Sequence, residues 1–166
     1  MKTNITYLMG LVSEYERKLN IFTVGLREHV YTITIKELDG TENIIEDYNE
    51  DFKIEYDEYL NVSNQIIKIK QIIYSKNNEL KLPDGNSIQD ALVEVSLLRK
   101  RSYLLEELCA FKSTNRRVTE VNNSYFECKS LNFDAKSLKE EKEKLDTRIR
   151  EIEFEISKLN SLEFEI

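Results

Sequence analysis

The sequence predicts a mainly α fold, with four long antiparallel helices in a coiled coil or helical bundle and a small β-hairpin or three-stranded β element. Apolar residues recur at alternating gaps of three and four in four separate segments, which places them on one stripe of a helix. The chain has only 4 Gly and 1 Pro, and 33% of its residues are charged. This composition is typical of long helices. Its 166 residues fit a single domain that needs neither disulfides nor metals to fold.

The first predicted helix spans residues 4–27 and weakens near Gly25, because glycine costs a helix interior about 1 kcal/mol relative to alanine. Residues 30–36 are rich in β-branched side chains and predict a short strand that ends at a glycine turn. A second helix is expected over residues 42–76, where Glu55 takes a place in the stripe that should be apolar. The alternation of Phe52, Ile54 and Tyr56 would also suit a strand locally.

The third predicted helix covers residues 87–112. Ser87 is expected to cap it, with Asp90 facing the positive end of the helix dipole. Residues 116–121 and 125–130 then predict two short strands with a tight turn between them, and this hairpin could join the strand over 30–36 in a three-stranded sheet. The fourth helix is predicted over 135–160, with Asp134 as its cap.

The charge is negative and unevenly distributed. A formal net charge of -7 argues against direct binding of nucleic acid, which needs a basic surface. Residues 42–58 hold eight acids against the single cation Lys53. Such a segment is either a solvated helix face, a docking surface for a basic protein partner, or a mimic of nucleic acid. The acids that we expect in a partner contact are Glu46, Asp47, Glu50 and Asp51.

Cofactor and membrane sites are not expected. Cys109, Cys128 and the single histidine, His29, cannot supply the four ligands of a zinc site, so both thiols are expected to be reduced and His29 to be an ordinary helix-end residue. The first residues lack the pattern of a secretory signal, and no run of about 18 apolar residues occurs. By elimination, the sequence predicts a cytoplasmic protein without a membrane contact.

Enzymatic motifs are not found either. The four glycines stand singly, so no glycine-rich phosphate loop exists, and no zinc-protease or serine-hydrolase motif occurs. Carboxylate pairs at 55–58 and 143–146 have the local spacing of Mg²⁺ sites in helical bundles, but solvated charge explains them better. The protein is therefore predicted not to be an enzyme.

Arginines gather in three predicted elements and define a second candidate site. If the last two helices are antiparallel, Arg101 approaches residues 146–150, and a half-buried cluster of Arg, Glu and Asp could form there. It would be either ordinary ion pairing between helices or a polar site for an anionic ligand or partner. Glu120 is the acid expected to pair with Arg117 or Arg101. The candidate residues of this cluster are Arg101, Arg117, Glu120, Asp146 and Arg148.

Residues 77–155 resemble the septicolysin-like family of small bacterial coiled-coil proteins. The resemblance rests on a glycine turn followed by Ser87-Ile88-Gln89-Asp90-Ala91-Leu92, Leu98-Arg99, Arg117-Val118-Thr119-Glu120-Val121 and Leu145-Asp146-Thr147-Arg148-Ile149. It implies a helix after the turn, a short extended segment and a final helix. The sequence departs from the family at residues 150–154 and 23–40, and no pore-forming segment matches the family's cytolysin-like name.

The function predicted first is a non-enzymatic scaffold or adaptor that self-associates as a homo-oligomer or binds a protein partner. One alternative is a phage- or defence-related acidic inhibitor that occupies a basic nucleic-acid-binding surface. A second alternative is a Mg²⁺-dependent all-α nucleotide hydrolase. No cofactor is predicted.

Overall fold

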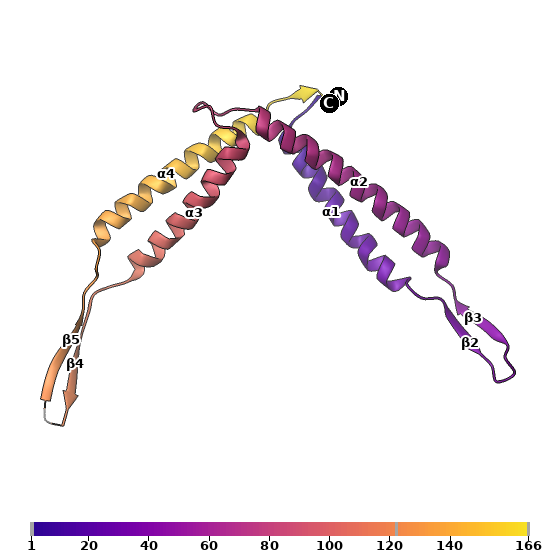
Figure 1. Cartoon of the computed structure of the whole chain (residues 1–166), viewed down its shortest axis with the longest axis horizontal. Coiled ribbons are helices and arrows are strands. Elements are labelled where there is room, and N and C mark those ends of the chain that lie inside the picture. The colour runs from indigo at the N-terminus through magenta and orange to yellow at the C-terminus, as the bar shows by residue number, and fades with distance from the viewer. Residues whose placement is uncertain (1, 122, 166) are drawn as a thin grey trace. The chain divides into compact units, whose positions relative to one another are not determined.

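The computed structural model describes residues 2–121 and 123–165 and is mainly helical, with small antiparallel β-hairpins, as predicted. The sequence predicts one domain, and within the structure the contacts gather in two compact units, Met1–Glu79 with Asn160–Ile166, and Leu80–Leu159. Apart from the short strands near the two termini, each unit has the order helix, two strands, second helix (Figure 1). In each unit the two helices lie side by side because a short hairpin connects them.

The first unit is built on α1 (Ile5–Glu28) and α2 (Asn49–Glu79). Asn4 caps α1, and its side chain accepts a hydrogen bond of 2.8 Å from the backbone N–H of Tyr7. Two contacts show that the helices run antiparallel. Glu16 pairs with Lys70 at 2.7 Å, whereas His29, at the end of α1, lies 3.1 Å from Glu55, near the start of α2. Burial of one apolar stripe from each helix holds them together, and its members are Ile5, Leu8, Val12, Val62, Ile66 and Ile73.

Between these helices lie β2 (Ile33–Lys36) and β3 (Glu42–Glu46), paired antiparallel. The expected strand over 30–36 is thus shorter than predicted, and the helix expected over 42–76 is wrong in its first part. Gly40 adopts a φ of 91°, which turns the chain so that residues 42–46 face β2. These residues then form a ladder with β2 instead of a helical turn.

α1 continues past Gly25 to Glu28, close to the predicted end at residue 27. The glycine makes room for Glu55 of α2. A Cβ at position 25 would lie 2.6 Å from Glu55 Oε1. Glu55 Oε2 lies 3.1 Å from His29 Nδ1, and the His29 ring stacks on Tyr48 with centroids 4.8 Å apart. The acid in the expected apolar place is therefore a polar contact between the two helices.

The second unit begins with a turn in which Leu82 N–H donates to Asn86 O at 2.8 Å and Gly85 has a φ of 88°. It continues into α3 (Ile88–Ala110). The predicted cap is confirmed, because Ser87 Oγ accepts from the Asp90 N–H at 3.0 Å and Asp90 Oδ2 accepts from the Ser87 N–H at 3.1 Å.

The rest of this unit is β4 (Thr114–Glu120), β5 (Asn123–Lys129) and α4 (Ala135–Asn160). The predicted hairpin and the helix over 135–160 are confirmed, as is the Asp134 cap, which accepts from the Lys136 N–H at 3.1 Å. Asn122 of the predicted turn lies outside the described residues. α3 and α4 bury one stripe, whose members are Ile88, Ala91, Val95, Leu105, Ile149, Ile152 and Ile156.

The three-stranded sheet is wrong for the described residues, in which every sheet has two strands. β2 pairs with β3, β4 pairs with β5, and a short β1 (Lys2–Thr3) pairs with β6 (Phe164–Glu165). The last pair was not predicted, because its strands are two residues long and lie at opposite ends of the sequence. Each of the two internal hairpins is thus a separate two-stranded sheet.

Candidate functional site

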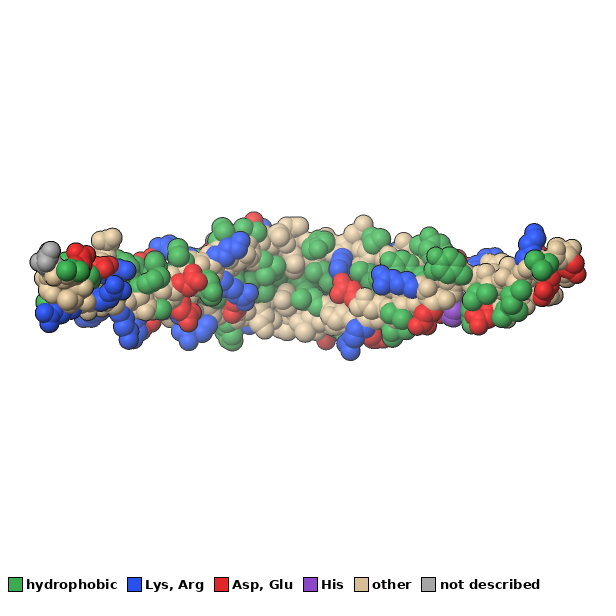
Figure 2. Space-filling model, turned by 90° about the horizontal axis from the view of Figure 1, so that it is seen from below, with side chains coloured by type: hydrophobic (Ala, Val, Ile, Leu, Met, Phe, Trp, Pro, Cys, Tyr) green, Lys and Arg blue, Asp and Glu red, His purple; other side chains and the backbone are tan. Residues whose placement is uncertain are grey.

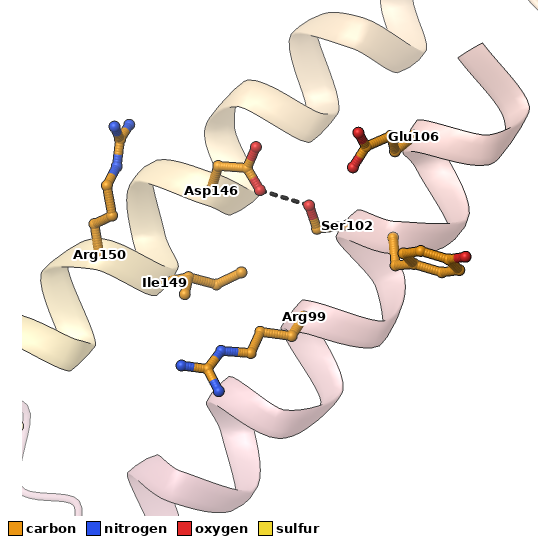
Figure 3. A pocket seen from close by; sticks show the side chains of 7 residues that line it. Arg99, Ser102, Glu106, Asp146, Ile149 and Arg150 are labelled. Atoms are coloured by element: carbon orange, nitrogen blue, oxygen red, sulfur yellow. Dashed lines mark hydrogen bonds between the residues drawn. The ribbon is translucent and has the colours of Figure 1, made fainter. Parts of the chain in front are cut away.

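A groove of about 420 Å³ lies between α3 and α4, in the region where the sequence predicts the arginine cluster (Figure 3). The α3 side consists of residues 99–106 and the α4 side of residues 146–150. Figure 3 shows Arg99 and Asp146 on opposite walls and the Arg150 side chain directed away from α3. The lining residues are Arg99, Ser102, Tyr103, Glu106, Asp146, Ile149 and Arg150.

Asp146 is the centre of the polar contacts in this groove. Ser102 Oγ donates a hydrogen bond to Asp146 Oδ1, and Lys142 Nζ lies 2.8 Å from Asp146 Oδ2. The hydrogen bond from Lys142, and then that from Ser102, lowers the pKa of the Asp146 carboxyl below its usual value. The hydrogen bond to Asp146 likewise raises the pKa of Lys142. Ser102 and Lys142 both stand at stripe positions, so they are polar interruptions of the helix contact.

Two arginines of α3 form ion pairs with acids of α4. Arg99 pairs with Glu153, and Arg101 pairs with Glu141. Arg101 thus reaches α4 as expected, although its partner is Glu141 and not Asp146. These pairs are partly exposed and contribute about 0–1 kcal/mol each. They explain the arginines of α3 as bridges that hold the two helices in register.

Arg148, on α4, lies 3.4 Å from carboxylates of two different elements. One is Asp84 in the turn before α3, and the other is Glu94 on α3. Arg148 is a residue of the predicted cluster, but neither of these partners was predicted. Only the antiparallel packing of α3 and α4 brings these acids to it.

Arg117 and Glu120 do not pair with one another in the part of the chain that the structure describes. Both lie on β4, and side chains three residues apart on a strand point to opposite faces. Glu120 Oε1 instead accepts a hydrogen bond of 3.4 Å from the Tyr125 hydroxyl, and Arg117 stands opposite Phe126 in the hairpin. The expectation that Glu120 pairs with Arg117 or Arg101 is therefore wrong.

The predicted acidic residues lie where β3 leads into α2. Asp47 accepts a hydrogen bond of 3.0 Å from the Asn49 N–H, and Glu50 and Asp51 lie in the first turn of α2. Acids in this position stabilise a helix through its dipole. The negative charge of Glu46, together with desolvation, raises the pKa of Tyr48. Three of the four predicted acids, Asp47, Glu50 and Asp51, thus have a structural role, because they stabilise the start of α2.

Large apolar side chains are exposed on both units, and Figure 2 shows hydrophobic surface over both helix pairs. Around the β2–β3 hairpin, hydrophobic and acidic side chains lie next to one another (Figure 2). Leu38, at the turn of this hairpin, is fully exposed. The exposed apolar residues of the hairpin and its flanks are Val30, Tyr31, Ile33, Ile35, Leu38, Ile44 and Ile45.

The carboxylate pairs considered as metal ligands are engaged elsewhere. Glu55 contacts His29, and Asp146 contacts Lys142. Within residues 2–121 and 123–165, no group of three or more His, Cys, Asp and Glu side chains is placed to hold a metal ion. Across the same residues, no helix combines the length and the apolar character needed to span a bilayer.

Asp146→Asn is expected to lower the free energy of unfolding at pH 7 by less than about 1 kcal/mol, since the carboxylate is about a third exposed. A carboxyl whose pKa is lowered by folding stabilises the native state above its unfolded pKa of about 3.9, and this stability is lost as the pH falls through the folded pKa. The difference between variant and parent should therefore disappear near pH 2. Urea unfolding at several pH values measures it.

The control for this variant is Glu151→Gln, an exposed residue of the same helix. It should leave the pH dependence of unfolding unchanged. A difference between Asp146→Asn and the parent that stays constant down to pH 2 would contradict the role assigned to the Asp146 charge.

Comparison with known proteins gives one relationship. No curated protein matches the chain, and no solved structure matches it. The resemblance to septicolysin-like proteins stays a prediction. Residues 46–163 match a family of unknown function, DUF6847. This range runs from the end of β3 through the whole of α2, α3, the β4–β5 hairpin and α4. Because the match covers well over half of the chain, the protein belongs to the DUF6847 family.

Proposed function

We propose that this protein is a cytoplasmic, non-enzymatic helical scaffold that self-associates through the apolar surfaces that its own helices and hairpins leave exposed. The observation that carries the proposal is the β2–β3 hairpin. All nine of its strand residues are exposed, among them Ile33, Ile35, Ile44 and Ile45. Several large apolar side chains exposed on one small element are typical of a protein contact surface.

The outer side of α3 supports the same proposal. Leu97 and Leu104 are each more than half exposed and stand seven residues apart on α3, and Phe111, the residue after the last of the helix, is 63% exposed. The spacing of seven puts Leu97 and Leu104 on one stripe, away from the buried face of α3. A groove of about 520 Å³ beside Leu104 and Phe111 adds a concave apolar surface. Three-four spacing on the inner face and a spacing of seven on the outer face suit helices packed as a coiled coil, which we include in the proposal.

The polar seam supports a structural rather than a chemical role for the α3–α4 groove. Its most buried acid, Asp146, already has two partners, and Arg99 and Arg101 have carboxylate partners on α4. Buried or half-buried polar contacts of this kind define the register of paired helices. The groove therefore serves to align α3 with α4.

Sedimentation velocity and light scattering at 1–100 μM test the proposal. These concentrations lie within the range of about μM to mM in which weak protein contacts form. We expect a mass above 19.7 kDa that rises with protein concentration. A mass of one chain at every concentration would contradict self-association.

A further inference from the structure

The two internal hairpins share a property that sets them apart from the helices. Each consists of two strands alone, so the outer edge of every strand carries backbone N–H and C=O groups without a strand neighbour. In β2, β3 and β5 every residue is exposed, and in β4 only Val118 is partly covered. An isolated two-stranded hairpin is marginally stable in water, and three or more strands with an apolar face are needed for a stable sheet.

The side chains of both hairpins suit sheet formation. Ile33 and Ile35 lie on the same face of β2, and Ile45 of β3 adds to the exposed apolar surface of the hairpin. In the other hairpin, Val118 lies opposite Tyr125, and Phe126 is about two thirds exposed. β-branched and aromatic side chains of this kind stabilise sheets by packing against neighbours across strands.

The charges of the two hairpins are opposite. Residues 30–47 hold five acids against the one cation Lys36, a net charge of -4. Residues 112–130 hold four cations against Glu120 and Glu127, a net charge of +2. Surfaces of opposite sign attract one another and reject copies of themselves. Two copies of the same hairpin therefore repel one another, whereas the β2–β3 hairpin and the β4–β5 hairpin attract one another.

We propose that the β2–β3 hairpin of one copy pairs edge to edge with the β4–β5 hairpin of a second copy, forming a four-stranded sheet between chains. This inference rests on the proposed self-association and names its surface. The pairing satisfies open backbone groups at one edge of each hairpin and places the acidic hairpin against the basic one. Because two different surfaces meet, the contact is heterologous, and every chain offers both halves of it.

Two charge-reversed variants test the pairing. The acidic-hairpin variant carries Glu37→Lys, Glu42→Lys and Glu46→Lys, which changes the net charge of residues 30–47 from -4 to +2. The basic-hairpin variant carries Lys112→Glu and Arg117→Glu, which changes residues 112–130 from +2 to -2. Far-UV circular dichroism checks that each variant keeps its helices.

Each variant alone should self-associate at least about tenfold more weakly than the parent, since all of its hairpins then have the same sign. An equimolar mixture of the two should associate again, because the hairpins of one variant are positive and those of the other are negative. A control with Glu58→Lys, Glu140→Lys and Glu151→Lys makes the same charge change as the acidic-hairpin variant, on exposed helix positions, and should associate as the parent does. Sedimentation velocity at low salt measures the parent and these four samples.

Hydrogen exchange gives a second readout. Backbone amides of residues 33–36, 42–46 and 114–120 should exchange more slowly in the mixture than in either variant alone. A parent that is a monomer at every concentration would overturn both the pairing and the proposed function. A parent oligomer that survives either reversal, or a mixture that fails to regain association, would overturn the pairing and leave self-association intact.

Discussion

Ile152→Ala is expected to lower the free energy of unfolding of the second unit by about 2–5 kcal/mol. Ile152 is 2% exposed and lies in the stripe that α4 packs on α3. Truncation removes apolar contacts and leaves a cavity that long, stiff helices do not readily close. Since a single domain is stable by only about 5–15 kcal/mol, this loss should be visible as earlier unfolding in urea and as faster amide exchange in α3 and α4.

Phe154→Ala is the matched control for this variant. It removes a larger side chain from the same helix, but Phe154 is 61% exposed and contacts Lys158 on the surface. We expect a cost of less than about 1 kcal/mol. Equal losses for Ile152→Ala and Phe154→Ala would contradict the assigned packing face of α4.

Ile5→Ala is expected to have an effect of the same size, about 2–5 kcal/mol, on the first unit. Ile5 begins α1 and is 1% exposed, beside the short pair of β1 and β6. Its removal takes apolar area from the point where the two ends of the sequence meet α1. Amides of α1 and α2 should then exchange faster, as hydrogen exchange with mass spectrometry measures.

Met9→Ala is the control on the same helix, one turn further along. Met9 is 52% exposed, so its truncation should change the stability by only about 0.5 kcal/mol. If Ile5→Ala were as mild as Met9→Ala, the burial of the α1 stripe in this unit would be contradicted.

Much of the helical structure could be predicted from local signals. α4 has the predicted bounds of 135–160, and the caps at Ser87 and Asp134 are where the sequence placed them. These elements depend on neighbouring residues alone, because a cap satisfies free amides within its own first turn and a stripe is defined by spacing. The helix predicted over residues 42–46 was wrong because local signals do not decide the structure of this segment. Its isoleucines fit both a helix stripe and a strand, and only pairing with β2 decides between them.

The candidate site was harder to predict, because its contacts join residues that are far apart in sequence. Glu55 was recognised as a break in an apolar stripe, but its partner His29 lies 26 residues away. Ser102 and Asp146 are 44 residues apart. The sequence predicted a cluster of Arg, Glu and Asp in this region, but not the hydrogen bond between these two residues. Polar residues at stripe positions were the available signal. A spacing rule identifies such residues without naming their partners.

By itself, the sequence therefore determined the number of long helices, the caps that begin two of them, the β4–β5 hairpin and the acidic character of the segment before α2. These follow from propensity, periodicity and charge, which act within a few residues. The tertiary structure alone decided that residues 42–46 form a strand, that the contacts gather in two units, and that Asp146 pairs with Ser102 and Lys142. Each of these depends on which distant segment packs alongside, because a strand or a half-buried charge is stable only when a neighbour completes its hydrogen bonds.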